Sequence, residues 1–207
     1  THFETCISAL SAPKLESVTF AKGTSTICNG LLANCPSLKS INIPDSVKSI
    51  GASVFSDCEA LESIDIPDSV KSIGSYAFSG CEALESVRLP EGGCEIGAKD
   101  DRGSYGFVFS GCTSLKRIAI PDGLTTPDAH NATTGAFAAP ALESVAIANN
   151  ASAIDGGLLA NCPSLKSVDI PDSVKSIGAF AFSGCEALEA VRLPEGGCEI
   201  GAKDDRG

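Results

Sequence analysis

Ten cysteines give this 207-residue chain its clearest potential for chemistry, because thiols form disulfides and thiolates bind zinc. No two of them have the C-x-x-C spacing, and neither His2 nor His130 lies in a cluster with cysteine. Six occupy one place in a repeated pattern, three residues before a leucine: Cys35, Cys58, Cys81, Cys112, Cys162 and Cys185. Because a buried cysteine packs as a small hydrophobic residue, we expect unpaired core thiols at this place, with no metal and no cofactor.

Two cysteines fall outside this pattern and take positions that hold lysine in other copies. Cys94 and Cys198 align with Lys48, Lys71 and Lys175. Because lysine is rarely buried, we expect both thiols to face solvent and to be the most open to oxidation.

Acidic and amide side chains suggest two other kinds of site. Paired aspartates follow a glycine-rich stretch at 100–101 and 204–205. Ca²⁺ requires six to eight oxygen ligands, which these short turns do not supply, so solvated turns are expected. Asn131 and Asn150 each begin a triplet that fits the N-glycosylation acceptor. Such triplets arise often by chance, and they are used only in proteins that a eukaryote secretes.

Catalysis has little support in the sequence. A nucleophile needs a base within hydrogen-bond reach and a group that orients the base. His130 is the only internal histidine, and neither a G-x-S-x-G motif nor a phosphate-binding glycine loop is present. We therefore expect a protein that is not an enzyme.

Charge and hydropathy disfavour two classes of partner. The formal net charge is -11, and the basic residues are not clustered as a phosphate backbone requires. We therefore expect no nucleic-acid partner. No run of 18 apolar residues occurs, so we also expect no membrane insertion of this segment.

The strongest signal is an internal repeat. Strings such as LESIDI and LKSVDI recur at intervals of 23 residues, with two longer intervals of 31 and 27. Their first residues are Leu15, Leu38, Leu61, Leu84, Leu115, Leu142, Leu165 and Leu188. Longer segments also recur, since 31–52 returns as 158–179 and 84–103 returns as 188–207. Several units were therefore duplicated as a block.

One unit, 61–83, illustrates the internal plan. The L-x-x-I-x-I string predicts a short strand with one buried face, which Pro67 ends because it has no N–H for the ladder. Val70 and Ile73 return the chain inward, and 77–81 fits one short helical turn. A single unit cannot cover its apolar face, so neighbouring units must stack.

The pattern L-x-x-I-x-I-P-x-S-V-x-x-I-G-x-x-A-F-x-x-C resembles the BspA-like leucine-rich repeat, most closely over 38–83 and 165–187. The unit at Leu84 departs from it by an eight-residue insertion. The unit at Leu115 departs by having Pro127 in place of isoleucine. The resemblance implies an α/β horseshoe solenoid, with a curved parallel sheet on the concave side and short helical turns and loops on the convex side. It also implies a cell-surface or secreted protein that adheres to other surfaces.

Residues 1–207 are accordingly expected to form a single repeat domain of about eight 23-residue units, two of them with insertions. The chain starts and stops partway through a unit, so we expect flanking repeats or a partner at both open ends.

Side chains at the third and fifth positions of each string should line the sheet face, and most of them are serine or alanine. The exceptions form a charged strip of Asp65, Arg88 and Arg117. The inserted loop adds Tyr105 and Phe107, and aromatic and arginine side chains supply most interface energy. These five residues are our candidate contacts for a protein or glycan partner.

Two functional hypotheses remain open. The first is a non-catalytic interaction or adhesion module of a cell-surface or secreted protein. The second is a structural scaffold subunit packed inside a larger intracellular or organellar assembly, which many reduced cysteines would suit.

Overall fold

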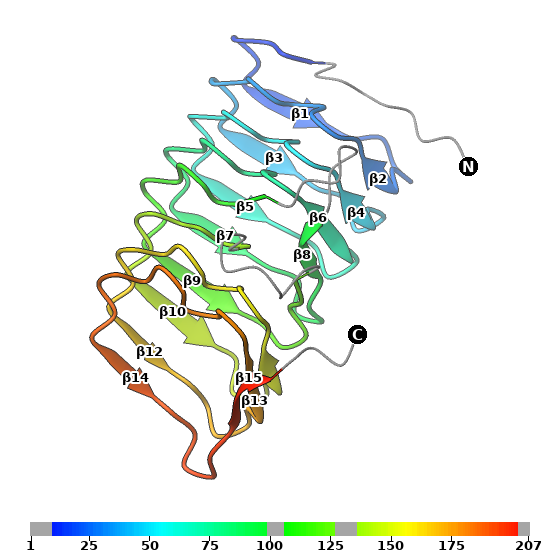
Figure 1. Ribbon diagram of the computed structural model, residues 1–207. Helices are drawn as coiled ribbons and strands as arrows, with labels where there is room; N and C mark the ends of the chain where they lie inside the picture. Colours follow the sequence, from blue (N-terminus) through cyan, green and yellow to red (C-terminus); the bar gives the residue numbers. More distant parts are fainter. Residues whose placement is uncertain (1–9, 99–105, 127–135, 203–207) are drawn as a thin grey trace.

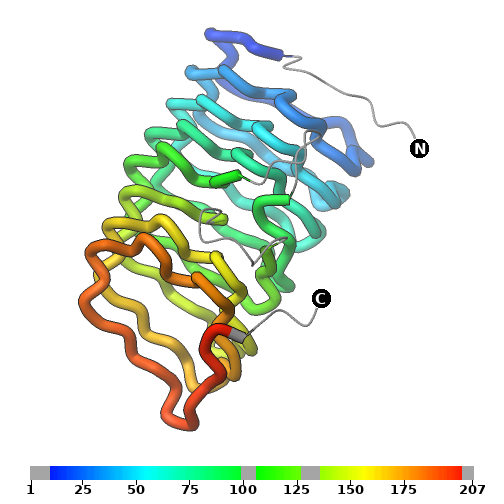
Figure 2. Tube along the Cα trace, in the orientation of Figure 1, coloured from blue at the N-terminus to red at the C-terminus, as the bar shows by residue number. Residues whose placement is uncertain are grey.

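In a computed structural model, described over residues 10–98, 106–126 and 136–202, the chain winds into a stack of similar coils (Figures 1 and 2). Each coil has three sides, of which the first two carry short strands. The strands of the first side form the first column: β1 (Ser17–Thr19), β3 (Ser40–Asn42), β5 (Ser63–Asp65), β7 (Ser86–Arg88), β9 (Arg117–Ile120), β10 (Ser144–Ile147), β12 (Ser167–Asp169) and β14 (Ala190–Arg192). These are the strands that the repeated strings predict.

Pairing within the first column is parallel and follows the repeat. Ser17 lies opposite Ser40, and Ser63 opposite Ser86, each 23 residues apart. Arg117 lies opposite Ser144, so the 27-residue interval does not disturb the register. The predicted single sheet is divided into three hydrogen-bonded groups, β1-β3, β5-β7 and β9-β10-β12-β14.

The second side of each coil carries strands that the sequence analysis did not predict. They are β2 (Thr26–Ile27), β4 (Ser49–Ile50), β6 (Ser72–Gly74), β8 (Glu95–Ala98), β11 (Ala153–Ile154), β13 (Ser176–Gly178) and β15 (Glu199–Ala202). All pairs in this second column are also parallel. Its strands are only two to four residues long. With one buried isoleucine in most of them, such short strands show no alternation of apolar and polar residues from which they could be predicted.

The second column is interrupted between β8 and β11, at the unit whose expected isoleucine is Pro127. A single bridge joins Glu95 to Thr125 there. The Asp155 carboxylate accepts hydrogen bonds from the backbone N–H of Thr126 at 2.6 Å and from its hydroxyl at 3.2 Å. The single proton of this hydroxyl is shared with the carbonyl of Gly156, which is the nearer acceptor at 2.8 Å. These hydrogen bonds join the two coils at a place where the described residues form no strand ladder.

The third side, here called the turn side, consists of turns and not of the expected short helical turns; no helix is assigned within the described ranges. Its backbone N–H groups bond to the next coil, as Phe55 to the Ala77 carbonyl at 2.8 Å and Asp57 to that of Ser79 at 2.7 Å. Ser53 and Asp57 have φ values of 53° and 58°. Residues with left-handed backbone angles every four positions interrupt a right-handed helix. In addition, an N–H group that bonds to the next coil cannot form a hydrogen bond within a helix.

The core between the three sides is a continuous apolar column. Phe55, Phe78 and Phe109 are fully buried, and their rings stack with centroids 5.3 Å and 5.5 Å apart. Each ring therefore packs against its counterpart in the next coil, which is how units too small to bury their own cores stabilise one another.

Candidate interaction surface

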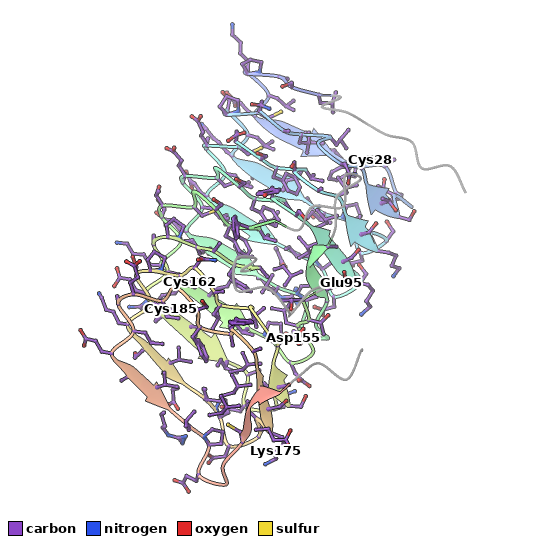
Figure 3. The ribbon with its side chains drawn as sticks, in the orientation of Figure 1. Cys28, Glu95, Asp155, Cys162, Lys175 and Cys185 are labelled. Atoms are coloured by element: carbon purple, nitrogen blue, oxygen red, sulfur yellow. The ribbon has the colours of Figure 1, made fainter. Side chains whose placement is uncertain are left out.

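The six cysteines of the repeat position lie inside the coil stack, as predicted. Cys58 and Cys81 are fully buried, and no thiol at this position is in a disulfide. The Cys58 thiol donates to the carbonyl of Leu32 in the preceding coil, 3.3 Å away, and Cys81 repeats the contact with Phe55 at 3.1 Å. Cys162 and Cys185 also lie on neighbouring coils (Figure 3), and the Cys185 thiol donates to the carbonyl of Leu159 in the preceding coil at 3.2 Å. The ladder of thiols is structural.

Burial also sets the chemistry of these thiols. It raises the pKa of Cys58, Cys112 and Cys162 to about 12, because an apolar interior disfavours the thiolate. The nucleophilic form is therefore scarce at neutral pH, and these side chains are poor candidates for catalysis or metal binding.

The expectation that Cys94 faces solvent is wrong. Cys94 is buried, and burial raises the pKa of its thiol to about 12. The next coil covers it, since the Thr125 N–H donates to the Cys94 carbonyl at 3.0 Å and Gly93 packs against Gly123. Cys198, its counterpart at the end of the stack, is partly exposed.

The outward side chains of the first column form what we call the strand face. In β5 and β7 the middle residue is buried, while the third and fifth positions of the string, such as Ser63 and Asp65, are exposed. The predicted alternation is therefore confirmed here. The strand face runs along successive coils of the stack (Figure 1).

Arg88 lies at the centre of a cluster of carboxylates on this face. Its guanidinium donates to Asp65 and to Asp68, each at 3.0 Å, and to the carbonyl of Ile66 at 3.0 Å. The Glu91 backbone N–H and the Arg88 guanidinium hold the pKa of the Asp68 carboxyl below its ordinary value. Of the predicted strip, the structure thus brings Asp65 and Arg88 together as an internal ion pair.

Asp68 is a member of this cluster that the sequence analysis missed. It follows the strand-ending Pro67, and its carboxylate also accepts the Glu91 N–H at 3.0 Å. Asp172 receives the Glu195 N–H in the same way, at 2.9 Å. The recurrence of I/L-P-D/E after most strings was a signal that could have identified it.

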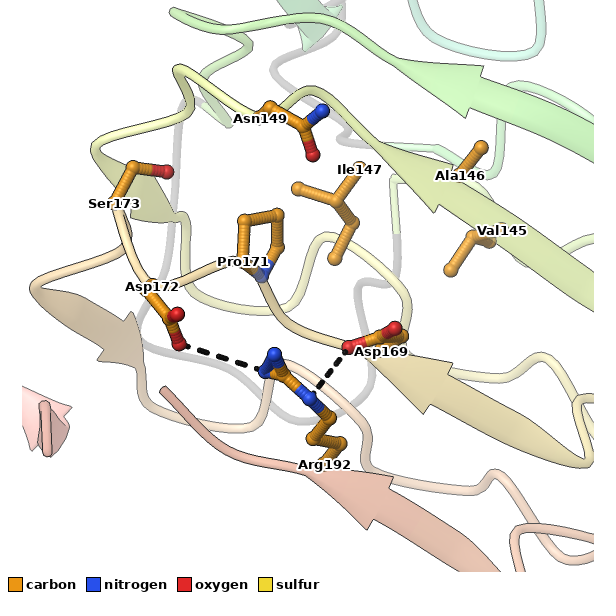
Figure 4. A pocket seen from close by; sticks show the side chains of 9 residues that line it. All are labelled: Val145, Ala146, Ile147, Asn149, Asp169, Pro171, Asp172, Ser173 and Arg192. Carbon is orange, nitrogen blue, oxygen red and sulfur yellow. Dashed lines mark hydrogen bonds and ion pairs between the residues drawn. The ribbon is translucent and has the colours of Figure 1, made fainter. Parts of the chain in front are cut away.

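The Arg88 cluster occurs twice. Arg192 lies 3.5 Å from both Asp169 and Asp172 (Figure 4). Its guanidinium also donates to the Ile170 carbonyl at 3.3 Å. A depression of about 540 Å³ adjoins Arg88 and one of about 440 Å³ adjoins Arg192.

We call these two depressions pocket A and pocket B. Their linings are Ile41, Asn42, Ile43, Asp45, Asp65, Pro67, Asp68, Ser69 and Arg88 for pocket A, and Val145, Ala146, Ile147, Asn149, Asp169, Pro171, Asp172, Ser173 and Arg192 for pocket B. Every member of the second set lies 104 residues after a member of the first. The pockets differ in polarity at two places, where Ala146 replaces Asn42 and Asn149 replaces Asp45.

Arg117 lies between the pockets and is not part of either. It borders a shallow depression of about 380 Å³ whose other lining residues are serine, alanine, valine and isoleucine of β7, β9 and β10. Within the described residues no carboxylate lies within ion-pair distance of its guanidinium. Arg117 is therefore the arginine of the predicted strip whose donors remain open to a partner.

The two aromatic residues predicted as contacts, Tyr105 and Phe107, have different outcomes. Tyr105 lies outside the described residues. Phe107 is half-buried on the turn side, where its ring meets Tyr76 edge-on at 6.4 Å. It is therefore on a different side of the coil from Arg88, so Phe107 and the charged strip do not form one site.

Of the two candidate glycosylation sites, only Asn150 lies within the described residues. Asn131 lies outside the described residues, whereas Asn150 is exposed in the turn after β10. The hydroxyl of Ser152, the third residue of its triplet, donates to Asp122 at 3.2 Å.

The described ranges contain neither a cluster of metal-ligating side chains nor a membrane-spanning helix. No group of three histidine, cysteine, aspartate or glutamate side chains there is placed to hold a metal ion. Likewise, no described helix has the length and apolarity to span a bilayer.

Comparison with known proteins identifies the repeat. The family described as BspA-type leucine-rich repeat region matches the chain in six copies, over residues 7–99 and 105–203. A leucine-rich repeat protein of Bacteroides ovatus is 22% identical with a TM-score of 0.39, covering 90% of this chain and 75% of that one. A leucine-rich repeat protein of T. pallidum is 24% identical with a TM-score of 0.46, covering 86% and 74%. A leucine-rich cell surface protein of Faecalibacterium prausnitzii is 24% identical with a TM-score of 0.39, covering 92% and 61%. No curated protein matches the chain.

Proposed function

This chain belongs to the BspA-type leucine-rich repeat family, and from that premise we propose that it is a non-catalytic module that binds a protein or glycan on its strand face. Stacked repeats create extended surfaces that are generally used for interaction. We further propose that the module acts in adhesion, at a cell surface or in secreted form, as the family resemblance implies.

The observation that carries the proposal is the Arg117 depression. Small side chains such as Ala119 and Ala146 leave the sheet surface open there, with Val87 and Ile118 at its base. An arginine with uncommitted donors at the edge of an apolar depression is a typical anchor for a partner, because it can donate two parallel bonds to one carboxylate.

The test is binding of the purified chain to immobilised extracellular-matrix proteins and glycans, measured by surface plasmon resonance. For any partner found, Arg117→Ala should weaken binding by about 1–3 kcal/mol. Arg88→Ala should weaken it less, because the Arg88 donors are already bound to Asp65 and Asp68. Lys48→Ala serves as the matched control, since Lys48 is exposed beside β4 in the second column.

An equal loss in the Lys48→Ala variant would show that the strand face is not the binding surface. Recovery of the chain from its own cells in a stable intracellular complex that Arg117→Ala leaves intact would instead favour the structural-scaffold alternative.

A further inference from the structure

Pockets A and B are lined by residues at equivalent repeat positions, lie on the same face, and are separated by a fixed number of coils. We propose that they bind two basic side chains of one extended polypeptide segment, about 19 Å apart, so that the chain is a bivalent receptor for a basic ligand. The inference rests on the proposed binding role of the strand face, and it adds the class of partner and its spacing.

Charge determines which ligand fits. Pocket A is lined by three carboxylates and one guanidinium, and pocket B by two carboxylates and one guanidinium. Arg88 and Arg192 are each neutralised by the aspartates beside them. The net charge of both pockets is therefore negative, as is the formal charge of the chain, -11. A lysine or arginine side chain gains charge-assisted hydrogen bonds there, and a carboxylate or phosphate is repelled.

The polar groups beside the two arginine clusters differ between the pockets, and the exposed one in pocket A is available to a ligand. In pocket A, the exposed Asp45 carboxylate makes no hydrogen bond or ion pair within the described part of the chain. In pocket B, the Ser173 hydroxyl oxygen is buried and has no partner among the described residues. Its counterpart Ser69 donates to the Val47 carbonyl at 2.6 Å. A buried, unsatisfied hydroxyl is rare and costs free energy, so the polar groups of pocket B are less fully satisfied than those of pocket A.

The spacing of the pockets favours a single segment over two separate ligands. Pocket A centres on β5 and pocket B on β12, with β7, β9 and β10 between them. Three of the four steps join hydrogen-bonded strands, and the fourth joins β7 to β9, which contact each other without pairing; at about 4.8 Å per step the separation is about 19 Å. An extended strand rises about 3.3 Å per residue and a polyproline II helix about 3.1 Å, so six residues span this distance in either conformation. Residues i and i+6 also share a face in both, because six is a multiple of two and of three.

The surface between the pockets allows a backbone to lie close. The outward positions of β9 and β10 nearest to the path are Ala119 and Ala146, and they border the Arg117 depression. A segment that connects the pockets would therefore cross the small side chains without displacing a larger one.

The experiment uses the peptide Lys-Pro-Pro-Pro-Pro-Pro-Lys, whose stiff spacer holds the two lysines about 19 Å apart. Its affinity, measured by fluorescence anisotropy at low salt, should exceed that of either single-lysine version, with alanine at the other end, by about tenfold or more. Lys-Pro-Pro-Lys, with a spacing of about 9 Å, should bind no better than a single-lysine peptide, because it cannot reach both pockets.

Matched variants locate the effect. Asp68→Asn in pocket A and Asp172→Asn in pocket B each remove a charge while keeping an oxygen that accepts the neighbouring backbone N–H. Either change should abolish the tenfold advantage of the seven-residue peptide. Glu59→Gln, an exposed change on the turn side, should preserve it. Circular dichroism confirms that each variant is folded.

Equal affinity of the one- and two-lysine peptides would overturn the inference. Equally tight binding of Glu-Pro-Pro-Pro-Pro-Pro-Glu would overturn it as well. Neither result affects the proposed function, which fails if Arg117→Ala leaves partner binding unchanged or if Lys48→Ala weakens it equally.

Discussion

Residues 84–98 and 188–202 differ at one position, Ser86 against Ala190, yet they have different environments. Leu89 is 4% exposed and its counterpart Leu193 is 45% exposed; Ile96 is 0% exposed and Ile200 is 67% exposed. The first segment has a coil on both sides, and the second has a described coil on one side only. Burial in this fold is therefore supplied by the neighbouring coil and not by the sequence of the unit itself.

The largest expected effect is at the isoleucine pair. Ile96→Ala should lower the free energy of unfolding by about 2–5 kcal/mol, because a fully buried side chain leaves a cavity. Ile200→Ala should change it by less than about 0.5 kcal/mol, since that side chain is mostly in solvent. Urea titration of both variants measures the difference. Similar losses at the two positions would contradict the role assigned to the neighbouring coil.

A glycine pair separates backbone strain from contact between coils. Gly93 and Gly197 have φ values of 69° and 73°, so alanine is strained at both. A Cβ at Gly93 would also overlap the carbonyl oxygen of Gly123, whereas none of the atoms near Gly197 lies within 4 Å of such a Cβ. Gly197→Ala should cost about 1 kcal/mol and Gly93→Ala about 2–3 kcal/mol in urea unfolding. Equal losses in the two variants would mean that backbone strain alone, and not contact with the next coil, determines the cost of each substitution.

The thiol pair comes next. Cys81→Ala should cost about 1–2 kcal/mol, and Cys185→Ala less, because Cys185 is only partly buried. Iodoacetamide labelling of the native chain, followed by mass spectrometry, should modify Cys185 well before Cys81. Rapid modification of Cys81 would contradict the buried thiol ladder.

The same thiols predict loss of stability in alkali. Burial raises the pKa of Cys58 and Cys112 from 9.0 to about 12, so the folded chain retains protons that the unfolded chain releases. The contribution of the protonated thiols to the free energy of unfolding is complete below pH 9 and is lost as the pH rises toward 12. The urea midpoint should therefore fall over this range, and less steeply in a Cys58→Ala variant. An unchanged midpoint would show that the thiols titrate normally.

The smallest expected effect is at the arginine pair. Arg88 lies 3.0 Å from Asp65 and from Asp68, and Arg192 lies 3.5 Å from Asp169 and from Asp172. Both pairs are solvent-exposed, so Arg88→Ala should change the free energy of unfolding by zero to about 1 kcal/mol, and Arg192→Ala by no more. A larger loss at Arg88 would indicate a structural ion pair and would weaken the case for pocket A as a ligand site.

What the sequence predicted and what it missed have a common physical origin. The register of β5 on β7 follows from a spacing of 23 residues, because identical units present identical hydrogen-bonding groups to one another. The burial of Cys94 could not be read from its alignment with Lys71, because it depends on the next coil near Gly123. The pairing of Arg88 with Asp68 was missed for the same reason, since the two residues are 20 positions apart in sequence.

The bonds that run from coil to coil have a consequence for how such a molecule can change length. Residues 31–52 recur 127 positions later, and residues 84–103 recur 104 positions later; the two offsets differ by 23, the length of one unit. Since the regular coils offer the same donors and acceptors to their neighbours, recombination among them can insert or delete a whole unit without creating a foreign interface. Each such event would move pocket B relative to pocket A by about 4.8 Å. The distance between the two pockets can therefore change over evolution in steps of one strand spacing, while the residues that line each pocket stay the same.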